Sequence, residues 1–295
     1  MVFNGSDHII VFVDTRLTKG IVASRVSPQG VVMDTGYTVN DGNNYPDVAS
    51  DGINSMAVWS REYSGVWARF VDAQAIPMDT AFCVGAILAS SADPAVGCGG
   101  GVYLVAWSDF NLPGGDLDVF SQTVSLSGQL IGDKTSIVRK DDTQKNPAVT
   151  FNGSNFLVAW QDDFDQVYCR YVGIDGKPIG DPCLVSDTAL SCERQNPAIA
   201  ASASRFLAVW AEYHDGFDLY GSVDDPITVA ERPAMTKPAV TRLPTVLFSA
   251  EMLKRYEKST FYDACGRRVK PGQAGPGVYF MTIDEGTILK AVKIK

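Results

Sequence analysis

The stretch "NPAVTFNGSNFLVAWQDD" (146–163) has three relatives of equal length in this chain. They are "YPDVASDGINSMAVWSRE" (45–62), "DPAVGCGGGVYLVAWSDF" (93–110) and "NPAIAASASRFLAVWAEY" (196–213). In all of them a proline stands thirteen residues before a tryptophan, and a shorter fifth copy, "VFNGSDHIIVFVDT" (2–15), has Phe12 at the tryptophan position. Self-similarity at such intervals is the signature of a repeat architecture, so the repeat decides the fold.

Each repeat unit predicts four short strands. In the copy that begins at residue 146, strand A is "PAVTF", strand B is "FLVAW", strand C is "VYCRYV" and strand D is "CLVSD". Strand B is apolar on both faces, strand C alternates, and glycine or asparagine stands at the tight turns. Four antiparallel strands that recur every ~45–50 residues are typical of a β-propeller blade.

The expected fold is therefore all-β, with a β-propeller of five four-stranded blades in residues 1–230 and a small C-terminal β-sandwich-like module in residues 231–295. The repeat units are expected at about 1–44, 45–92, 93–145, 146–195 and 196–230. A larger ring with further blades before residue 1 is the alternative, because the first unit begins within strand A.

Two recurring positions are expected to be structural. The tryptophan at the end of strand B is expected to pack between neighbouring blades. A carboxylate follows it by two residues in most units, and we expect that carboxylate to hold the turn between strands B and C. The positions concerned are Asp14, Asp109, Asp162 and Glu212.

Composition excludes some classes of function. The net charge of −9 gives no basic face for nucleic acid, and the pI is about 4.7. The sequence contains no stretch of 18 apolar residues that could span a membrane, and no signal-peptide pattern follows Met1. Of six cysteines, Cys183 and Cys192 flank a short linker and could pair in an oxidising compartment, whereas isolated buried thiols are the other interpretation.

Variation in length points to one face of the disc as the binding face. The B–C turns and the D–A linkers share a face and vary in length, whereas the A–B turns do not. This face is rich in carboxylates and aromatic rings, which suit the hydroxyls and ring faces of sugars. An acidic surface that only keeps the protein soluble is the alternative. The candidate ligand-binding residues are Tyr63, Trp67, Phe110, Phe164 and Tyr213.

The carboxylates of this face raise two chemical possibilities. The first is calcium, which takes about six to eight oxygen ligands, although no loop matches the EF-hand pattern and we expect no cofactor otherwise. Its candidate ligands are Asp109, Asp116, Asp118, Asp162 and Asp165. The second is glycoside hydrolysis by a carboxylate pair, for which Asp116, Asp163 and Asp215 depart most from the repeat. A nucleophilic triad is not expected, because the G-x-S-x-G motif is absent.

The last part of the chain has a different character. The segments "STFYDACGRRV" (259–269), "PGVYFMTIDEG" (276–286) and "ILKAVKIK" (288–295) predict three strands. They resemble the C-terminal sorting domains of bacterial proteins secreted by the type IX route, in which Tyr-Asp-x-x-Gly-Arg precedes Gly-Val-Tyr-Phe and a lysine-rich last strand. The resemblance implies a small immunoglobulin-like β-sandwich that engages an export machinery and attaches the protein to the cell surface. The matching residues are Tyr262, Asp263, Gly266, Arg267, Arg268, Val269, Gly277, Val278, Tyr279, Phe280, Lys290, Lys293 and Lys295.

The units themselves, as in "NFLVAWQDD", resemble propeller repeats of large bacterial exported proteins. We therefore expect an extracellular or cell-surface protein that binds polysaccharide or a surface protein at the B–C/D–A face without catalysis. A glycoside hydrolase or lyase that uses carboxylates of the same face is the alternative, so enzymatic activity is left open. A passive spacer in a surface assembly is the third interpretation.

Overall fold

The computed structural model describes residues 1–15, 20–41, 44–88, 92–110, 115–163, 165–186, 192–203, 205–213 and 217–224, and five strands between residues 245 and 293. All elements of this described part are β-strands, which confirms the all-β class. The chain divides into two compact units, Met1–Pro238 and Ala239–Lys295. Within the described ranges, no helix has the length and apolar character that crossing a membrane requires.

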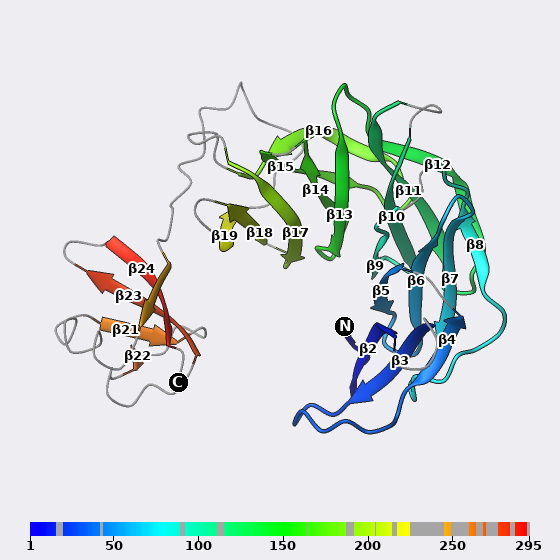
Figure 1. Ribbon diagram of the computed structural model, residues 1–295, viewed down its shortest axis with the longest axis horizontal. Coiled ribbons are helices and arrows are strands. Elements are labelled where there is room, and N and C mark those ends of the chain that lie inside the picture. Colours follow the sequence, from blue (N-terminus) through cyan, green and yellow to red (C-terminus); the bar gives the residue numbers. More distant parts are fainter. Residues whose placement is uncertain are drawn as a thin grey trace. The chain divides into compact units, whose positions relative to one another are not determined.

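The first unit is a five-bladed β-propeller, as expected (Figure 1). Blade 1 is β1 (Val2–Phe3), β2 (His8–Asp14), β3 (Gly20–Val26) and β4 (Tyr37–Asp41). Blade 2 is β5 (Asn44–Ser50), β6 (Ser55–Arg61), β7 (Gly65–Val71) and β8 (Phe82–Gly85). Blade 3 is β9 (Ala95–Gly99), β10 (Val102–Phe110), β11 (Leu117–Ser125) and β12 (Leu130–Val138). Blade 4 is β13 (Gln144–Phe151), β14 (Phe156–Asp162), β15 (Gln166–Val172) and β16 (Pro178–Leu184). Blade 5 has three described strands, β17 (Arg194–Ala201), β18 (Phe206–Tyr213) and β19 (Phe217–Asp224).

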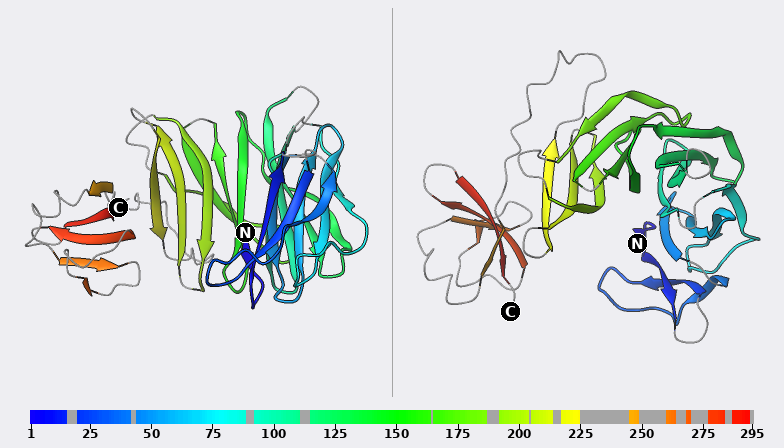
Figure 2. Two further views of the ribbon diagram at one scale, coloured as in Figure 1. Left: turned by 60° about the horizontal axis from the view of Figure 1, so that its bottom comes forward. Right: turned by 45° about the horizontal axis from the view of Figure 1, so that its top comes forward.

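The first strand of each blade is the innermost. These inner strands lie beside one another in chain order, with β5 next to β9, β9 next to β13 and β13 next to β17. The later strands of each sheet follow outward in antiparallel order, and the blades succeed one another around the axis (Figure 2). Every D–A linker therefore returns the chain from the outer edge of one blade to the axis.

Short polar turns fix the register of blades 1, 2 and 4. In the A–B turn of blade 4, Asn152 Oδ1 accepts hydrogen bonds from the amides of Ser154 (3.0 Å) and Asn155 (2.9 Å). Gly153, between Asn152 and Ser154, has a φ of 98°, a conformation that favours glycine. Asn4 makes the same contacts in blade 1. This side-chain turn needs a fixed number of residues, which explains the equal length of the A–B turns in these blades.

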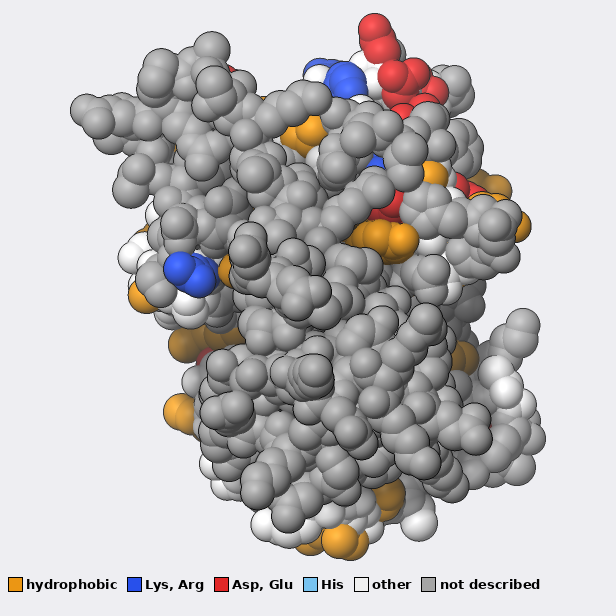
Figure 3. All heavy atoms as spheres, turned by 90° about the vertical axis from the view of Figure 1, so that its left-hand side faces the viewer, with side chains coloured by type: hydrophobic (Ala, Val, Ile, Leu, Met, Phe, Trp, Pro, Cys, Tyr) orange, Lys and Arg blue, Asp and Glu red, His pale blue; other side chains and the backbone are white. Residues whose placement is uncertain are grey.

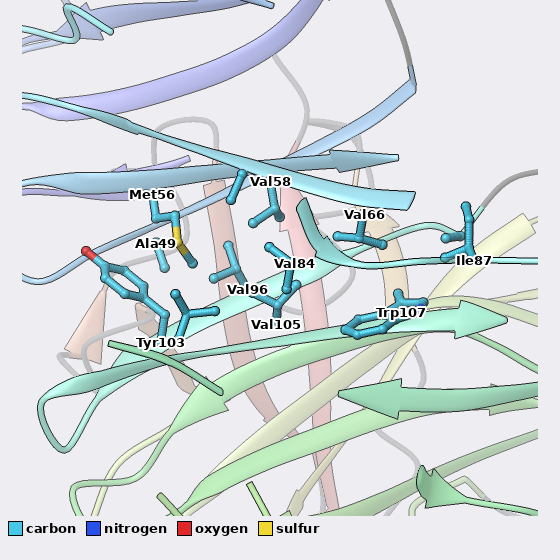
Figure 4. Close-up of a cluster of buried hydrophobic side chains, with 13 residues drawn as sticks. Ala49, Met56, Val58, Val66, Val84, Ile87, Val96, Tyr103, Val105 and Trp107 are labelled. Carbon is cyan, nitrogen blue, oxygen red and sulfur yellow. The ribbon is translucent and has the colours of Figure 1, made fainter. Parts of the chain in front are cut away.

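The hydrophobic cores lie between neighbouring blades. Figure 4 shows the cluster between blades 2 and 3, where Trp107 and Tyr103 of β10 pack against Met56, Val58 and Val66 of blade 2. The tryptophans of the other units occupy the same place: Trp59, Trp107 and Trp160 have no exposed surface and Trp210 is 2% exposed. Each belongs to the cluster shared with the preceding blade, so the expected packing role is confirmed.

The outer face of blade 5 carries exposed apolar side chains. On β18 and β19, Leu207, Leu219 and Val223 are 44%, 65% and 61% exposed. They alternate with residues such as Trp210 that pack on blade 4. Hydrophobic side chains are visible in orange on the side of the molecule that Figure 3 shows.

The second unit is a small mixed sheet. Its described strands are β20 (Thr245–Phe248), β21 (Thr260–Asp263), β22 (Arg268–Val269), β23 (Gly277–Ile283) and β24 (Thr287–Lys293). They pair in the order β20-β24-β23-β21-β22, and β20 runs parallel to β24. The three segments that the sequence marked as strands therefore supply β21 to β24.

Candidate active site

Four X-Pro dipeptides form a pocket at the axis of the propeller. Each dipeptide stands at the inner strand of its blade, where the D–A linker ends, so the pocket lies at the face that the variable loops indicated. Its volume is about 290 Å³. The lining residues are Tyr45, Pro46, Asp93, Pro94, Asn146, Pro147, Asn196 and Pro197.

A β-bulge gives the dipeptide its position. In blade 4 the ladder between β13 and β14 is regular up to Lys145 and resumes at Ala148, which leaves Asn146 and Pro147 outside the pairing. The ladders of blades 2 and 5 are interrupted at the equivalent place. Proline has no amide hydrogen to donate and is tolerated at bulges, and a bulge redirects the neighbouring side chain. The repeated proline therefore serves the pocket.

The residue before each proline has a positive φ: 58° at Tyr45, 37° at Asp93, 52° at Asn146 and 49° at Asn196. Asparagine and aspartate tolerate this region, and a bulky aromatic residue does not. Tyr45 is therefore the strained member of the set, and its side chain is 53% exposed. Strain of this kind is concentrated at functional sites.

Amide groups connect two blades at the pocket. Asn146 Nδ2 donates to Asn196 Oδ1 over 3.2 Å and to Gln161 Oε1 over 3.1 Å. Among the described residues, the lining has neutral hydrogen-bonding groups, the ring of Tyr45 and the carboxylate of Asp93, without a lysine or arginine. Such a surface is suited to an uncharged polyhydroxyl ligand.

A second carboxylate, that of Asp47, is next in sequence to a lining residue, Pro46, but is not itself part of the lining. Asp47 follows the dipeptide of blade 2, at a position where the other units have Ala95, Ala148 and Ala198. Its Oδ2 accepts a hydrogen bond of 2.9 Å from the amide of Val96 on β9. Burial raises the pKa of Asp47 above its ordinary value, and the amides of Val96 and Val48 offset part of this effect.

Among the described residues, carboxylates that recur after the tryptophans also contact the D–A linkers, which the sequence did not predict. Asp109 accepts hydrogen bonds from the amide of Leu88 in the linker (2.7 Å) and from Lys134 Nζ (2.6 Å), besides that of Phe110 at the start of its own turn. Asp162 accepts from Lys140 Nζ (3.1 Å), in the linker between blades 3 and 4.

Glu212 has the same role in blade 5. It accepts hydrogen bonds from Arg194 Nε (3.0 Å), Trp210 Nε1 (3.0 Å) and Cys192 Sγ (3.1 Å). Arg194 also donates to the backbone carbonyl of Asp165 in blade 4, so this buried ion pair joins two blades.

These contacts occupy several of the candidate calcium ligands. Asp109 and Asp162 are buried and paired with lysines. Asp118 is buried opposite Asp109 in the β10–β11 ladder, and burial raises its pKa although the amide of Lys140 partly offsets this. Asp116 is exposed and Asp165 is half-buried. Among the described residues, no group of three or more histidine, cysteine, aspartate or glutamate side chains could hold a metal ion.

The aromatic candidates lie outside the axial pocket. Tyr63 is 73% exposed in its turn, and half-buried Trp67 lies beneath the guanidinium of Arg61, 4.7 Å from the ring centre. Phe110 is half-buried at the end of β10. Tyr213 is 47% exposed and packs edge-on against Phe217 with ring centres 5.1 Å apart. Phe164 lies outside the described residues. None of the four described aromatic residues lines the pocket.

The candidate carboxylates for hydrolysis come from three different blades. Asp116 is exposed before β11. Asp163 is half-buried in the turn after β14, where its amide donates to the carbonyl of Thr143 over 2.6 Å. Asp215 lies outside the described residues. Neither Asp116 nor Asp163 reaches the axial pocket.

The residues that line the pocket are not among the candidates that the sequence suggested. They belong to the blocks of constant length, whereas the candidates come from the loops that vary in length. The signal that would have found the pocket is a change of residue type at constant spacing: the position before the proline is Tyr45, Asp93, Asn146 or Asn196.

No family model and no curated protein matches this chain. Solved structures with a similar arrangement include a GH43 endo-arabinanase from Bacillus licheniformis, with 13% identity, a TM-score of 0.46, and coverage of 85% of this chain and 93% of that one. An endo-arabinase from Bacteroides thetaiotaomicron has 12% identity, a TM-score of 0.43 and the same coverage. TolB from Acinetobacter baumannii has 12% identity and a TM-score of 0.46 over 98% of this chain and 67% of that one.

These neighbours contradict the expectation of a non-catalytic exported or cell-surface binding or scaffold protein. The two arabinanases and a family-43 glycoside hydrolase are among them. At such identities the likeness concerns the fold, and no residue and no substrate is transferred to this chain.

Proposed function

We propose that this chain is a glycoside hydrolase whose reacting groups are at the axial pocket. The observation that carries the proposal is the placement of two carboxylates at the same end of neighbouring inner strands. Asp93 lines the pocket, and Asp47 is hydrogen-bonded to Val96, three residues after Asp93. Both carboxylates belong to the part of the chain where the blades converge.

The two carboxylates have environments suited to different tasks. A glycosidase needs one carboxylic acid to protonate the leaving oxygen and one carboxylate to act on the anomeric carbon, directly or through water. Burial raises the pKa of Asp47, which favours the protonated form that a general acid requires. Asp93 is half-buried at the pocket and is assigned to the ionised role.

The remaining pocket residues suit sugar binding. The ring of Tyr45 is available for stacking against a pyranose or furanose face, which would account for retaining a strained aromatic residue. The amides of Asn146 and Asn196 can exchange hydrogen bonds with hydroxyl groups. Because the lining carries the carboxylate of Asp93, which would repel an acidic polymer, the proposed substrate is a neutral polysaccharide.

The test is release of new reducing ends from a panel of neutral and acidic polysaccharides. Wild-type protein is expected to cleave at least one neutral polymer, and Asp93→Asn and Asp47→Asn are each expected to lower the rate by about 100-fold or more. The matched control is Asp175→Asn, an exposed carboxylate in the C–D turn of blade 4. No release from any polymer, or equal activity in the pocket variants, would refute the proposal.

Two additions to the assay extend it. The anomer formed first, followed by NMR, reports the carboxylate separation, because retaining enzymes place the pair about 5–5.5 Å apart and inverting enzymes about 6.5–9.5 Å. Parallel reactions with Ca²⁺ and with EDTA test whether cleavage depends on calcium, one of the two possibilities that the loop carboxylates raised. Equal rates in both would remove the metal from the mechanism.

We also propose that the protein acts outside the cell and that its second unit, Ala239–Lys295, directs export. The sequence resemblance to sorting domains supports this, and a polysaccharide substrate is consistent with it. The test compares cell fractions of a type IX-secreting host that expresses the chain behind a signal peptide, with and without residues 239–295. Equal surface and medium levels for both forms would contradict the export role.

A further inference from the structure

Two cysteines of blade 4 lie directly opposite each other. Cys169 on β15 is the ladder partner of Cys183 on β16, and both side chains belong to the core between blades 4 and 5. Their exposed fractions are 0% and 6%. Opposed residues of an antiparallel pair have Cα atoms about 4.5–5.5 Å apart and point to the same face, which is within the range of about 4.4–6.8 Å found in disulfides.

We propose that Cys169 and Cys183 form a disulfide when the chain folds in an oxidising compartment. Two S–H bonds break and one S–S bond forms. The two electrons pass to a small disulfide oxidant such as oxidised glutathione, which accepts them with two protons and becomes two thiols. The pair closes a loop between positions fourteen residues apart.

The contacts of the other thiols favour this pairing over Cys183 with Cys192. Cys192 Sγ donates to the Glu212 carboxylate over 3.1 Å, a contact that a disulfide would remove. Cys183 Sγ has a long contact of 3.7 Å with the carbonyl of Leu184, which costs little to lose. Cys98 is on blade 3, and burial raises the pKa of its thiol to about 11, so it is expected to stay reduced.

An irregularity in the β15–β16 ladder gives the proposed disulfide a structural role. The pairing of β15 with β16 is irregular immediately beyond Cys169, between that residue and Tyr171. A covalent bond at this point holds the outermost strand of blade 4 where the backbone hydrogen bonds are interrupted.

The test is mass spectrometry after refolding the full chain in a glutathione redox buffer or in dithiothreitol. Thiols are blocked with N-ethylmaleimide in denaturant at low pH before digestion with trypsin. Cleavage after Lys145, Arg170 and Arg194 places Cys169 in peptide 146–170 and both Cys183 and Cys192 in peptide 171–194. A covalent 146–170/171–194 species is expected from the glutathione sample alone.

Single variants identify the partner. The linked species is expected to persist in Cys192→Ser and to disappear in Cys183→Ala. The oxidised wild-type protein is expected to melt about 6–12 °C above the reduced one. Full alkylation of Cys169 and Cys183 after oxidative refolding would overturn the proposal, as would a link within peptide 171–194. Because wild-type protein supplies both redox forms, failure of a variant to fold would not affect this comparison.

Discussion

Replacing Glu212 by glutamine would leave a buried guanidinium without its counter-charge. Arg194 and Glu212 have side chains only 1% and 3% exposed, with Nε and Oε2 3.0 Å apart. At an effective dielectric constant of about 20, two unit charges at this separation attract by about 5.5 kcal/mol. Loss of one partner of a buried pair costs about 3–5 kcal/mol, and we expect Glu212→Gln to lower the free energy of unfolding by that amount.

The assay is urea unfolding of the full chain at pH 7, followed by tryptophan fluorescence. The control variant is Asp175→Asn, whose partner Lys177 is 3.5 Å away with both side chains largely exposed, and it should leave the midpoint unchanged. The double variant Arg194→Met/Glu212→Leu should recover part of the loss, since it leaves no unpaired charge, although Trp210 Nε1 loses its acceptor. A loss below about 1 kcal/mol for Glu212→Gln would refute the reasoning.

The same pair predicts a pH dependence. Burial tends to raise the pKa of Glu212, but the hydrogen bonds from Trp210 and Cys192 and the charge of Arg194 outweigh it, so that the pKa lies below the ordinary value of 4.5. A carboxyl group whose pKa is lowered in the folded state stabilises the protein at pH values above its unfolded-state pKa. This stabilisation is lost as the pH falls through the folded-state pKa. The gap between wild type and Glu212→Gln should therefore narrow below about pH 4.

Three further changes test the pocket and the core. Tyr45→Asn should stabilise the fold by about 0.5–1 kcal/mol in urea unfolding, because asparagine tolerates the positive φ, while polysaccharide cleavage falls. Asp47→Asn should be more stable than wild type at pH 7, and the difference should vanish as the pH falls through the raised pKa of the carboxyl group. Gly85→Ala should lower the free energy of unfolding by about 1–3 kcal/mol, because its Cβ would lie 2.7 Å from a ring carbon of Trp107.

Local sequence determined the fold because its signals act within one unit. The Asn152 turn and the apolar strand that ends at Trp160 each depend on residues only a few positions apart, and both recur at a constant spacing. The role of Asp109 could not be predicted in this way. Its own turn begins at the next residue, whereas the linker amide that it accepts from is 21 residues earlier in the chain.

The candidate site was hidden for a related reason. Departure from the repeat was used as the criterion for a functional carboxylate in the loops only. Asp47 departs from the repeat inside a strand, where three other units have alanine. Its raised pKa depends on packing between blades, which a single unit does not contain.

The four X-Pro dipeptides of the pocket also affect how this protein can change over evolutionary time. Blades 2 to 5 each contribute the residue before one proline to the pocket, and in blades 2, 4 and 5 a bulge within the blade sets the backbone that carries it. A point mutation at residue 45, 93, 146 or 196 therefore alters the chemistry of the pocket without a change in loop length or blade packing. Gene duplication of the unit would have supplied several equivalent positions, and selection could then adjust them one codon at a time.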